Sequence, residues 1–162
     1  MFYPVLMPDI LTTEEIVHMK DTLKPGLKHT FSFLVSKNKT VPCVYPESDL
    51  FLDMPPVFAT AFMVGFIEWA CMEALRPYLD EGEITLGTMI NVTHQAATPP
   101  GMKVTAHVTC LEVDGKRTVW EIEALDEVEI IGRGTHERFT VNKEKFSLRV
   151  ASKGGTRGEH TL

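Results

Sequence analysis

VFATAFMVGFIEWAC, residues 57–71, is the stretch that decides how this chain folds. It follows a pair of prolines, which a first helical turn tolerates, and its side chains are apolar on nearly every face. The uncharged run ends at Glu68, well short of the roughly 20 apolar residues that cross a bilayer. We therefore predict that residues 57–79 form a helix that is buried in protein and does not span a membrane.

Segments rich in strand-forming residues flank this helix on both sides. Residues 27–36 alternate apolar and polar side chains and predict one strand before it. Four further strands are predicted after it, over residues 84–96, 102–113, 118–126 and 128–141. Asp114-Gly115 is typical of a hairpin between two of them. One curved antiparallel sheet around one apolar helix fits this order, which is the α+β hot-dog architecture. Because edge pairing protects exposed strands, we expect a homodimer.

The rest of the chain predicts three further segments. Residues 1–24 are expected to be an N-terminal arm with a short helix over 13–23, opened by a capping box. Residues 37–56 form a long loop with prolines, an acidic cluster and scattered apolar side chains, which is typical of a lid. The folded domain is expected over residues 25–150, and the Gly-rich residues 151–162 predict a flexible tail.

Composition narrows the class of function. The 162 residues favour a single domain, and 16 basic against 22 acidic residues leave a net charge of −6. Nucleic acid is disfavoured as the main partner, because phosphates attract positive surfaces. The cysteines are odd in number and lack CxxC spacing, which disfavours a disulfide framework or a zinc site. The N-terminus lacks a basic signal segment, so we expect a cytoplasmic protein.

Glu68 is the most informative side chain, because all its near neighbours in sequence are apolar. An unpaired buried carboxylate costs several kcal/mol, on the order of a domain's whole stability. It is therefore a structural carboxylate, a carboxylate on a helix face that meets water, or a functional group held in a cleft. Thr60 precedes it by eight residues, which is a rotation of about 80° and a rise of about 12 Å on the helix. The two flank one side of the helix without touching, with Gly65 leaving room between them.

Three more residues are candidates with a structural alternative each. His94 lies in a strand pattern, and a sheet folded over the helix would let it meet Glu68 as a general acid–base pair. Gly87 either presents its backbone N–H to an oxyanion or marks a β-bulge. Arg138 either holds an anionic group of a substrate or pairs with Glu137.

Other catalytic signatures are missing from the sequence. It contains no GxSxG nucleophile elbow, no P-loop and no HExxH metal motif. None of the cysteines has an activating partner nearby in sequence. We therefore expect no metal and no redox cofactor.

Four local strings carry a resemblance to a known family. They are YPES at 45–48, VFATAFMVGFIEWAC at 57–71, LGTMINVTHQAATPPG at 86–101 and GTHER at 134–138. Through them, and from about residue 31 to about residue 146, the chain strongly resembles the fluoroacetyl-CoA thioesterase family. These are hot-dog enzymes, so the resemblance implies hydrolysis of an acyl-CoA substrate.

The resemblance also implies a role for each candidate residue. Thr60, Glu68 and His94 match the family's catalytic threonine, glutamate and histidine. Gly87 matches the glycine whose backbone N–H contacts the thioester carbonyl. Arg138 matches an arginine at the rim of the active site.

The lid of the family is matched with one departure. Val41, Val44 and Phe51 correspond to its apolar lid residues. Met54 stands where the fluoroacetyl-specific enzyme has a second, gating phenylalanine. Methionine is flexible and fills irregular gaps. We therefore predict weaker discrimination between fluoroacetyl and acetyl groups in this chain.

Three functions are compatible with these residues. The first is hydrolysis of a short-chain acyl-CoA, such as fluoroacetyl-CoA, by Thr60, Glu68 and His94. The second is a non-catalytic module that binds acyl-CoA in the same cleft. The third is a hot-dog enoyl-CoA hydratase, which would need an aspartate–histidine pair that the helix of this chain does not offer. Thiol release and loss of enoyl absorbance distinguish the three.

Overall fold

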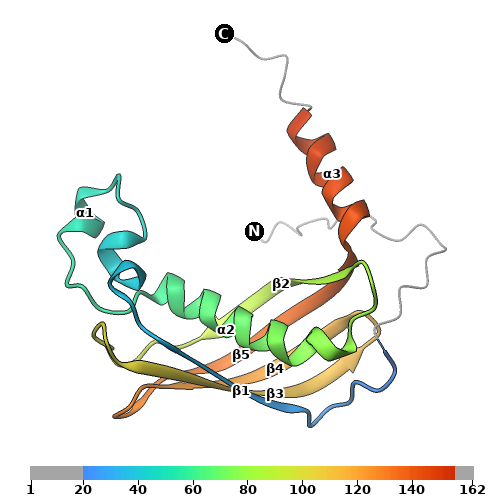
Figure 1. Ribbon diagram of the computed structural model, residues 1–162, viewed down its shortest axis with the longest axis horizontal. Coiled ribbons are helices and arrows are strands. Elements are labelled where there is room, and N and C mark those ends of the chain that lie inside the picture. Colours follow the sequence, from blue (N-terminus) through green and yellow to red (C-terminus); the bar gives the residue numbers. More distant parts are fainter. Residues whose placement is uncertain (1–19, 156–162) are drawn as a thin grey trace, which may run out of the picture.

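The computed structural model describes residues 20–155 and contains five strands and one long helix (Figure 1). The strands are β1 (Lys28–Leu34), β2 (Glu83–Val92), β3 (Lys103–Asp114), β4 (Arg117–Leu125) and β5 (Ile130–Asn142). The helices are α1 (Asp49–Leu52), α2 (Thr60–Leu75) and α3 (Lys143–Gly155). Short 3₁₀ turns occupy Lys37–Lys39, Val41–Cys43 and Arg76–Tyr78.

All five strands form one antiparallel sheet in the order β1-β3-β4-β5-β2. The sheet curves around α2, which lies along its inner face (Figure 1). β3 and β4 form the predicted hairpin, with Gly115 at a φ of 54° in the turn. This backbone conformation suits glycine, because it has no Cβ to clash. The predicted α+β arrangement of one sheet around one helix is confirmed.

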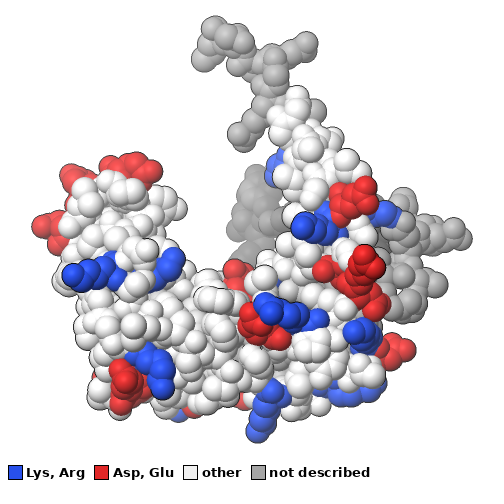
Figure 2. Space-filling view, in the orientation of Figure 1, with Lys and Arg blue, Asp and Glu red and all other residues white. Residues whose placement is uncertain are grey.

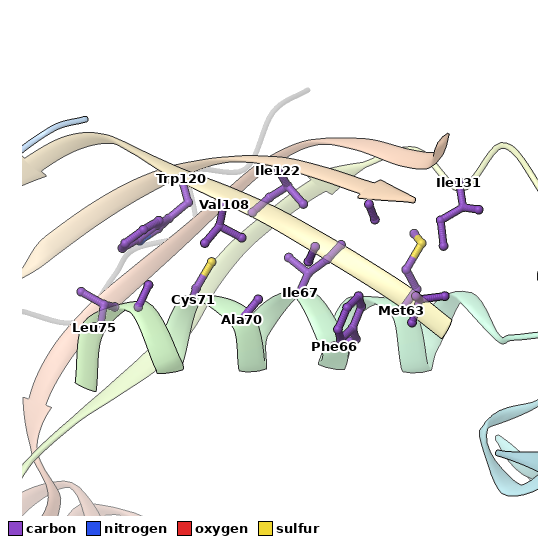
Figure 3. Packing of buried hydrophobic residues seen from close by; sticks show 14 of the residues in the cluster. Met63, Phe66, Ile67, Ala70, Cys71, Leu75, Val108, Trp120, Ile122 and Ile131 are labelled. Atoms are coloured by element: carbon purple, nitrogen blue, oxygen red, sulfur yellow. The ribbon is translucent and has the colours of Figure 1, made fainter. Parts of the chain in front are cut away.

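The core lies between α2 and the inner face of the sheet (Figure 3). The helix contributes a row of buried side chains: Met63, Phe66, Ile67, Ala70, Cys71, Ala74 and Leu75. Alternate residues of β3 and β4 face them, and Val108, Trp120 and Ile122 are almost completely buried. On the β1 side, Phe31 packs 4.5 Å from the ring of Trp69. The helix is thus covered on its sheet-facing side, while Trp69 and Met72 remain about half exposed.

The ends of α2 differ from the prediction of residues 57–79. It begins at Thr60, because Phe58 is extended and its N–H bonds to the carbonyl of Thr98 at 2.8 Å. It ends at Leu75, ahead of Pro77, which continues into a 3₁₀ turn. These boundaries matter because they place Thr60 in the first turn of the helix.

The structure describes only part of the two predicted terminal segments. Most of the predicted helix over residues 13–23 lies outside the described residues, and residues 21–22 form a turn. Next to this turn, Leu23 packs into the core. At the other end, α3 continues through Gly155, so the first residues of the predicted tail are helical. Within the described part of the chain, no helix is both long enough and apolar enough to cross a membrane.

Candidate active site

Thr60 and His94 meet at the N-terminal end of α2. Thr60 is the first residue of the helix, and His94 follows the end of β2 by two residues. The segment around His94 stays fastened to β5, because the N–H groups of Thr93 and Gln95 each donate to a β5 carbonyl at 2.8 Å. Thr60 Oγ1 and His94 Nδ1 are 2.8 Å apart, a hydrogen bond between two side chains 34 residues apart in sequence. The fold therefore pairs a hydroxyl with an imidazole.

The environment of His94 favours its neutral form. Burial lowers the pKa of His94 below its ordinary value, and the backbone of Ala96 opposes this in part. Its Nε2 atom is buried and has no hydrogen-bond partner within residues 20–155. A neutral imidazole beside a hydroxyl is able to accept a proton from it.

Glu68 lies two turns further along α2, opposite Gly87 of β2. Its side chain is 41% exposed, so the carboxylate is neither buried nor fully in water. A methyl group built on Gly87 would overlap Glu68 Oε1 and would come within 3.1 Å of His136 Cε1. A side chain at position 87 would therefore displace this carboxylate from its place beside the strand.

Arg138 of β5 provides the positive charge beside Glu68. Its Nη1 atom is 3.7 Å from Glu68 Oε1. Its Nε and Nη2 atoms donate to the hydroxyl and the carbonyl of Thr85, at 2.9 and 2.7 Å. Burial lowers the pKa of Arg138, and Glu68 opposes this shift. The buried guanidinium is thus held in place by neutral acceptors while one edge faces the carboxylate.

Two expectations about Arg138 need correction. Arg138 is only 3% exposed, so it lies beneath Glu68 and not at a solvent-exposed rim. It does not pair with Glu137, whose carboxylate binds Arg117 at 2.6 Å. Among the described residues, Glu68 and His94 share no hydrogen bond: His94 bonds Thr60, and Glu68 lies beside Arg138. A substrate would have to bridge the two pairs.

The predicted lid stands beyond the N-terminal end of α2, the end that carries Thr60 (Figure 1). Val41 and Val44 lie in and just after a 3₁₀ turn and are half-buried. Phe51 of α1 packs 5.3 Å from the ring of Tyr45, and Met54 is 50% exposed. Figure 2 shows acidic side chains gathered over α1. The lid therefore carries both apolar and acidic side chains.

His136 is a component of the site that the sequence analysis did not select. It is 1% exposed, and its Nε2 atom lies 3.0 Å from Arg138 Nη1. The two-residue spacing between His136 and Arg138 could have revealed it, because alternate residues of one strand point to the same face of the sheet. Among residues 20–155, no three His, Cys, Asp or Glu side chains gather as a metal-binding group.

Comparison with known proteins identifies the family. The model of the fluoroacetyl-CoA-specific thioesterase family matches residues 35–144. The chain belongs to this family. A fluoroacetyl-CoA thioesterase of Streptantibioticus cattleyicolor is 50% identical over 135 residues, which cover 83% of this chain and 97% of that relative. The predicted class of enzyme, a thioester hydrolase, is thereby confirmed.

Solved structures agree with this family membership. A fluoroacetyl-CoA thioesterase with a threonine-to-serine substitution, in complex with acetyl-CoA, is 49% identical with a TM-score of 0.80. The match covers 81% of this chain and 98% of that chain. A thioesterase superfamily member from Thermus thermophilus is 28% identical with a TM-score of 0.75, over 86% and 100% of the two chains. The predicted hot-dog fold is confirmed.

Proposed function

We propose that this thioesterase hydrolyses a short-chain acyl-CoA with Thr60, Glu68 and His94 as its catalytic residues. The observation that carries the proposal is the arrangement along one helix. A Thr60–His94 hydrogen bond of 2.8 Å lies at its start, and a carboxylate paired with Arg138 lies two turns later. A carbonyl bound between them would meet a base, an attacking oxygen and the backbone of Gly87.

The reaction then proceeds by proton transfer through His94. The neutral imidazole takes a proton from the Thr60 hydroxyl or from a water, and the freed oxygen attacks the thioester carbonyl. Attack by Thr60 leaves an acyl-threonine ester, which a second water, deprotonated by His94, hydrolyses to the free acid. Glu68 either orients the attacking water or attacks the carbonyl itself, in which case water cleaves the resulting anhydride. Gly87 stabilises the oxyanion with its N–H. The carbon–sulfur bond breaks, and the CoA thiolate takes the proton that His94 removed from Thr60 or water, or, after direct attack by Glu68, a proton from solvent.

We infer that the acyl group is as small as acetyl or fluoroacetyl. Support comes from the family, whose members include a curated fluoroacetyl-CoA thioesterase that is 50% identical.

The lysine pair Lys37 and Lys39 lies at the base of the lid, and Lys39 Nζ stands 4.8 Å over the ring of Phe62. These cations, and not the buried Arg138, are the candidates for binding the anionic phosphates of CoA.

We also propose that the enzyme works as a homodimer in the cytoplasm. β2 is an edge strand of the sheet, and its Met89 and Ile90 are 39% and 40% exposed. Pairing two such edges would cover both the unpaired backbone groups and the apolar side chains. The three cysteines are free thiols, as expected in a reducing compartment.

The test is the substitution Glu68→Gln with a thiol-release assay on a panel of short acyl-CoA esters, including fluoroacetyl-CoA. Removing a group that acts in the transition state costs about 10²- to 10⁴-fold in rate. We expect a loss of this size in kcat with an unchanged thermal unfolding profile. Glu73→Gln is the matched control, because Glu73 lies on the same helix and pairs with Arg76.

Three outcomes would contradict the proposal. A Glu68→Gln variant with near-parental kcat would exclude Glu68 from the mechanism. Binding of CoA esters without thiol release by the parent protein would identify a binding module. Loss of enoyl absorbance without thiol release would identify a hydratase.

A further inference from the structure

We propose that His136 is a positioning residue that holds both the Gly87 segment of β2 and the Arg138 guanidinium against Glu68. This inference rests on the proposed function, because it assigns His136 a role through Glu68 and Gly87. His136 touches neither the lid nor the Thr60–His94 pair through any hydrogen bond of the described residues. Its contribution is to geometry and not to the reacting atoms.

The hydrogen bonds of His136 determine its protonation. Its Nδ1 lies 2.7 Å from the carbonyl oxygen of Met89, which can only accept, so Nδ1 carries the proton. Its Nε2 lies 3.0 Å from Arg138 Nη1, which can only donate, so Nε2 is the acceptor. His136 is therefore neutral in this arrangement. Burial and the charge of Arg138 both lower its pKa, which agrees with this assignment.

The Met89 carbonyl belongs to a β-bulge. Gly87 pairs with Arg138 and Met89 pairs with Glu137, so Thr88 is an extra residue without a place in the ladder. Bulges bend a strand locally and re-aim the neighbouring groups. Thr88 Oγ1 donates to Glu137 Oε1 at 2.8 Å on one side of the bulge, and Nδ1 of His136 binds the carbonyl of Met89 on the other. His136 thus secures the bulge next to Gly87.

The Nε2 side of the His136 imidazole restricts the orientation of the Arg138 guanidinium. Thr85 accepts from its Nε and Nη2 atoms, and His136 accepts from Nη1. Nη1 is also the atom that faces Glu68. With all three nitrogens engaged, the guanidinium plane cannot rotate without leaving a buried donor unpaired, which is unfavourable. His136 therefore connects the bulge, the arginine and the carboxylate.

The test separates the two hydrogen bonds of His136. In His136→Asn, the side-chain NH₂ replaces Nδ1 and keeps the bond to Met89. In His136→Gln, the amide oxygen replaces Nε2 and keeps the acceptor for Arg138. His136→Phe keeps neither. We expect kcat for thiol release to fall about 10-fold in the two amide variants and about 100-fold in the phenylalanine variant, with KM within about threefold. A loss confined to kcat indicates that transition-state stabilisation by Glu68 and Gly87 is weakened while substrate binding is unchanged.

Amide hydrogen exchange provides a second readout. Exchange at the amides of residues 87–90 should accelerate in the Gln and Phe variants and remain near parental in the Asn variant, because only the Asn variant keeps the Met89 bond. His107→Asn is the matched control, since His107 is exposed and bonds Thr30 at 2.9 Å on the other face of the sheet. It should leave both kcat and exchange unchanged.

Glu68→Gln, measured in parallel, separates this inference from the proposed function. If Glu68→Gln keeps near-parental kcat, the proposed function itself is wrong. If Glu68→Gln loses activity while all three His136 variants retain parental kcat per folded molecule, only the role of His136 is overturned. Equal losses in the Asn, Gln and Phe variants that track a loss of thermal stability would also overturn it, because they indicate a structural role alone.

Discussion

At the scale of single residues, the close approach of Glu68 to Gly87 gives the sharpest prediction. Gly87→Ala places a methyl group where Glu68 Oε1 lies, and 3.1 Å from His136 Cε1. The carboxylate must then move, so we expect kcat to fall about 10- to 100-fold in the thiol-release assay, with the fold retained. Gly154→Ala is the control, because nothing lies within 4 Å of a Cβ at that helical position. Parental kcat in Gly87→Ala would contradict the inferred contact.

The lowered pKa of His94 predicts where the acid limb of the pH–rate profile lies. Burial lowers its pKa in the folded enzyme, so the imidazole stays neutral below the ordinary histidine value of about 6.5. If His94 is the general base, kcat/KM measured from about pH 8 down to about pH 5 should show an acid limb whose midpoint lies below about 6.5. The measurement is kcat/KM over this range. An acid limb with a midpoint above 6.5 would contradict the assignment.

The residual activity of His94→Gln provides the control for this profile. Glutamine does not titrate, so the acid limb that belongs to His94 should be absent from the residual rate. A limb that persists unchanged in this variant would have to come from another group. That result would exclude His94 as the titrating base.

At the scale of elements, the lid is predicted to influence the selectivity between acyl groups. α1 and the turns before it project beyond α2, with Met54 50% exposed and Phe51 packed on Tyr45 (Figure 1). Met54→Phe should raise the ratio of kcat/KM for fluoroacetyl-CoA over acetyl-CoA by about 5-fold or more, because a stiff ring shapes the pocket better than a flexible thioether.

The control for the lid experiment changes a different lid residue in the same way. Leu50→Phe also introduces a ring, but Leu50 is 78% exposed. It should leave the selectivity ratio unchanged. Equal ratios of kcat/KM for the two substrates in the parent and in Met54→Phe would contradict a role of the lid in selectivity.

At the scale of the whole molecule, the free edge of β2 predicts the oligomeric state. Ile90→Asp places a charge on this edge, where Ile90 is 40% exposed. We expect the variant to be monomeric at concentrations where the parent is dimeric, because a buried unpaired carboxylate costs several kcal/mol. Sedimentation velocity measures the change. Val128→Asp is the control, since Val128 is 77% exposed near the β4–β5 turn.

Two results would contradict the predicted dimer. A monomeric parent protein would exclude it outright. A variant Ile90→Asp that stays dimeric would show that the edge of β2 is not the interface.

Much of this molecule was predictable from the sequence alone. Strand alternation and the apolar run before Glu68 predicted one sheet around one helix, because periodicity determines which faces can be buried. Element boundaries were less predictable. The start of α2 depends on a hydrogen bond from Phe58 to Thr98, 40 residues later, which no local pattern reveals.

The sequence by itself determined the fold, the family and the identity of the candidate residues, since these depend on local patterns and specific strings. Only the tertiary structure decided which of them are partners. It paired Thr60 with His94 and Glu68 with Arg138, and it brought the overlooked His136 beneath the site. The physical reason is that these contacts are made across strands and between sheet and helix. Register and curvature, and not distance along the chain, determine such contacts.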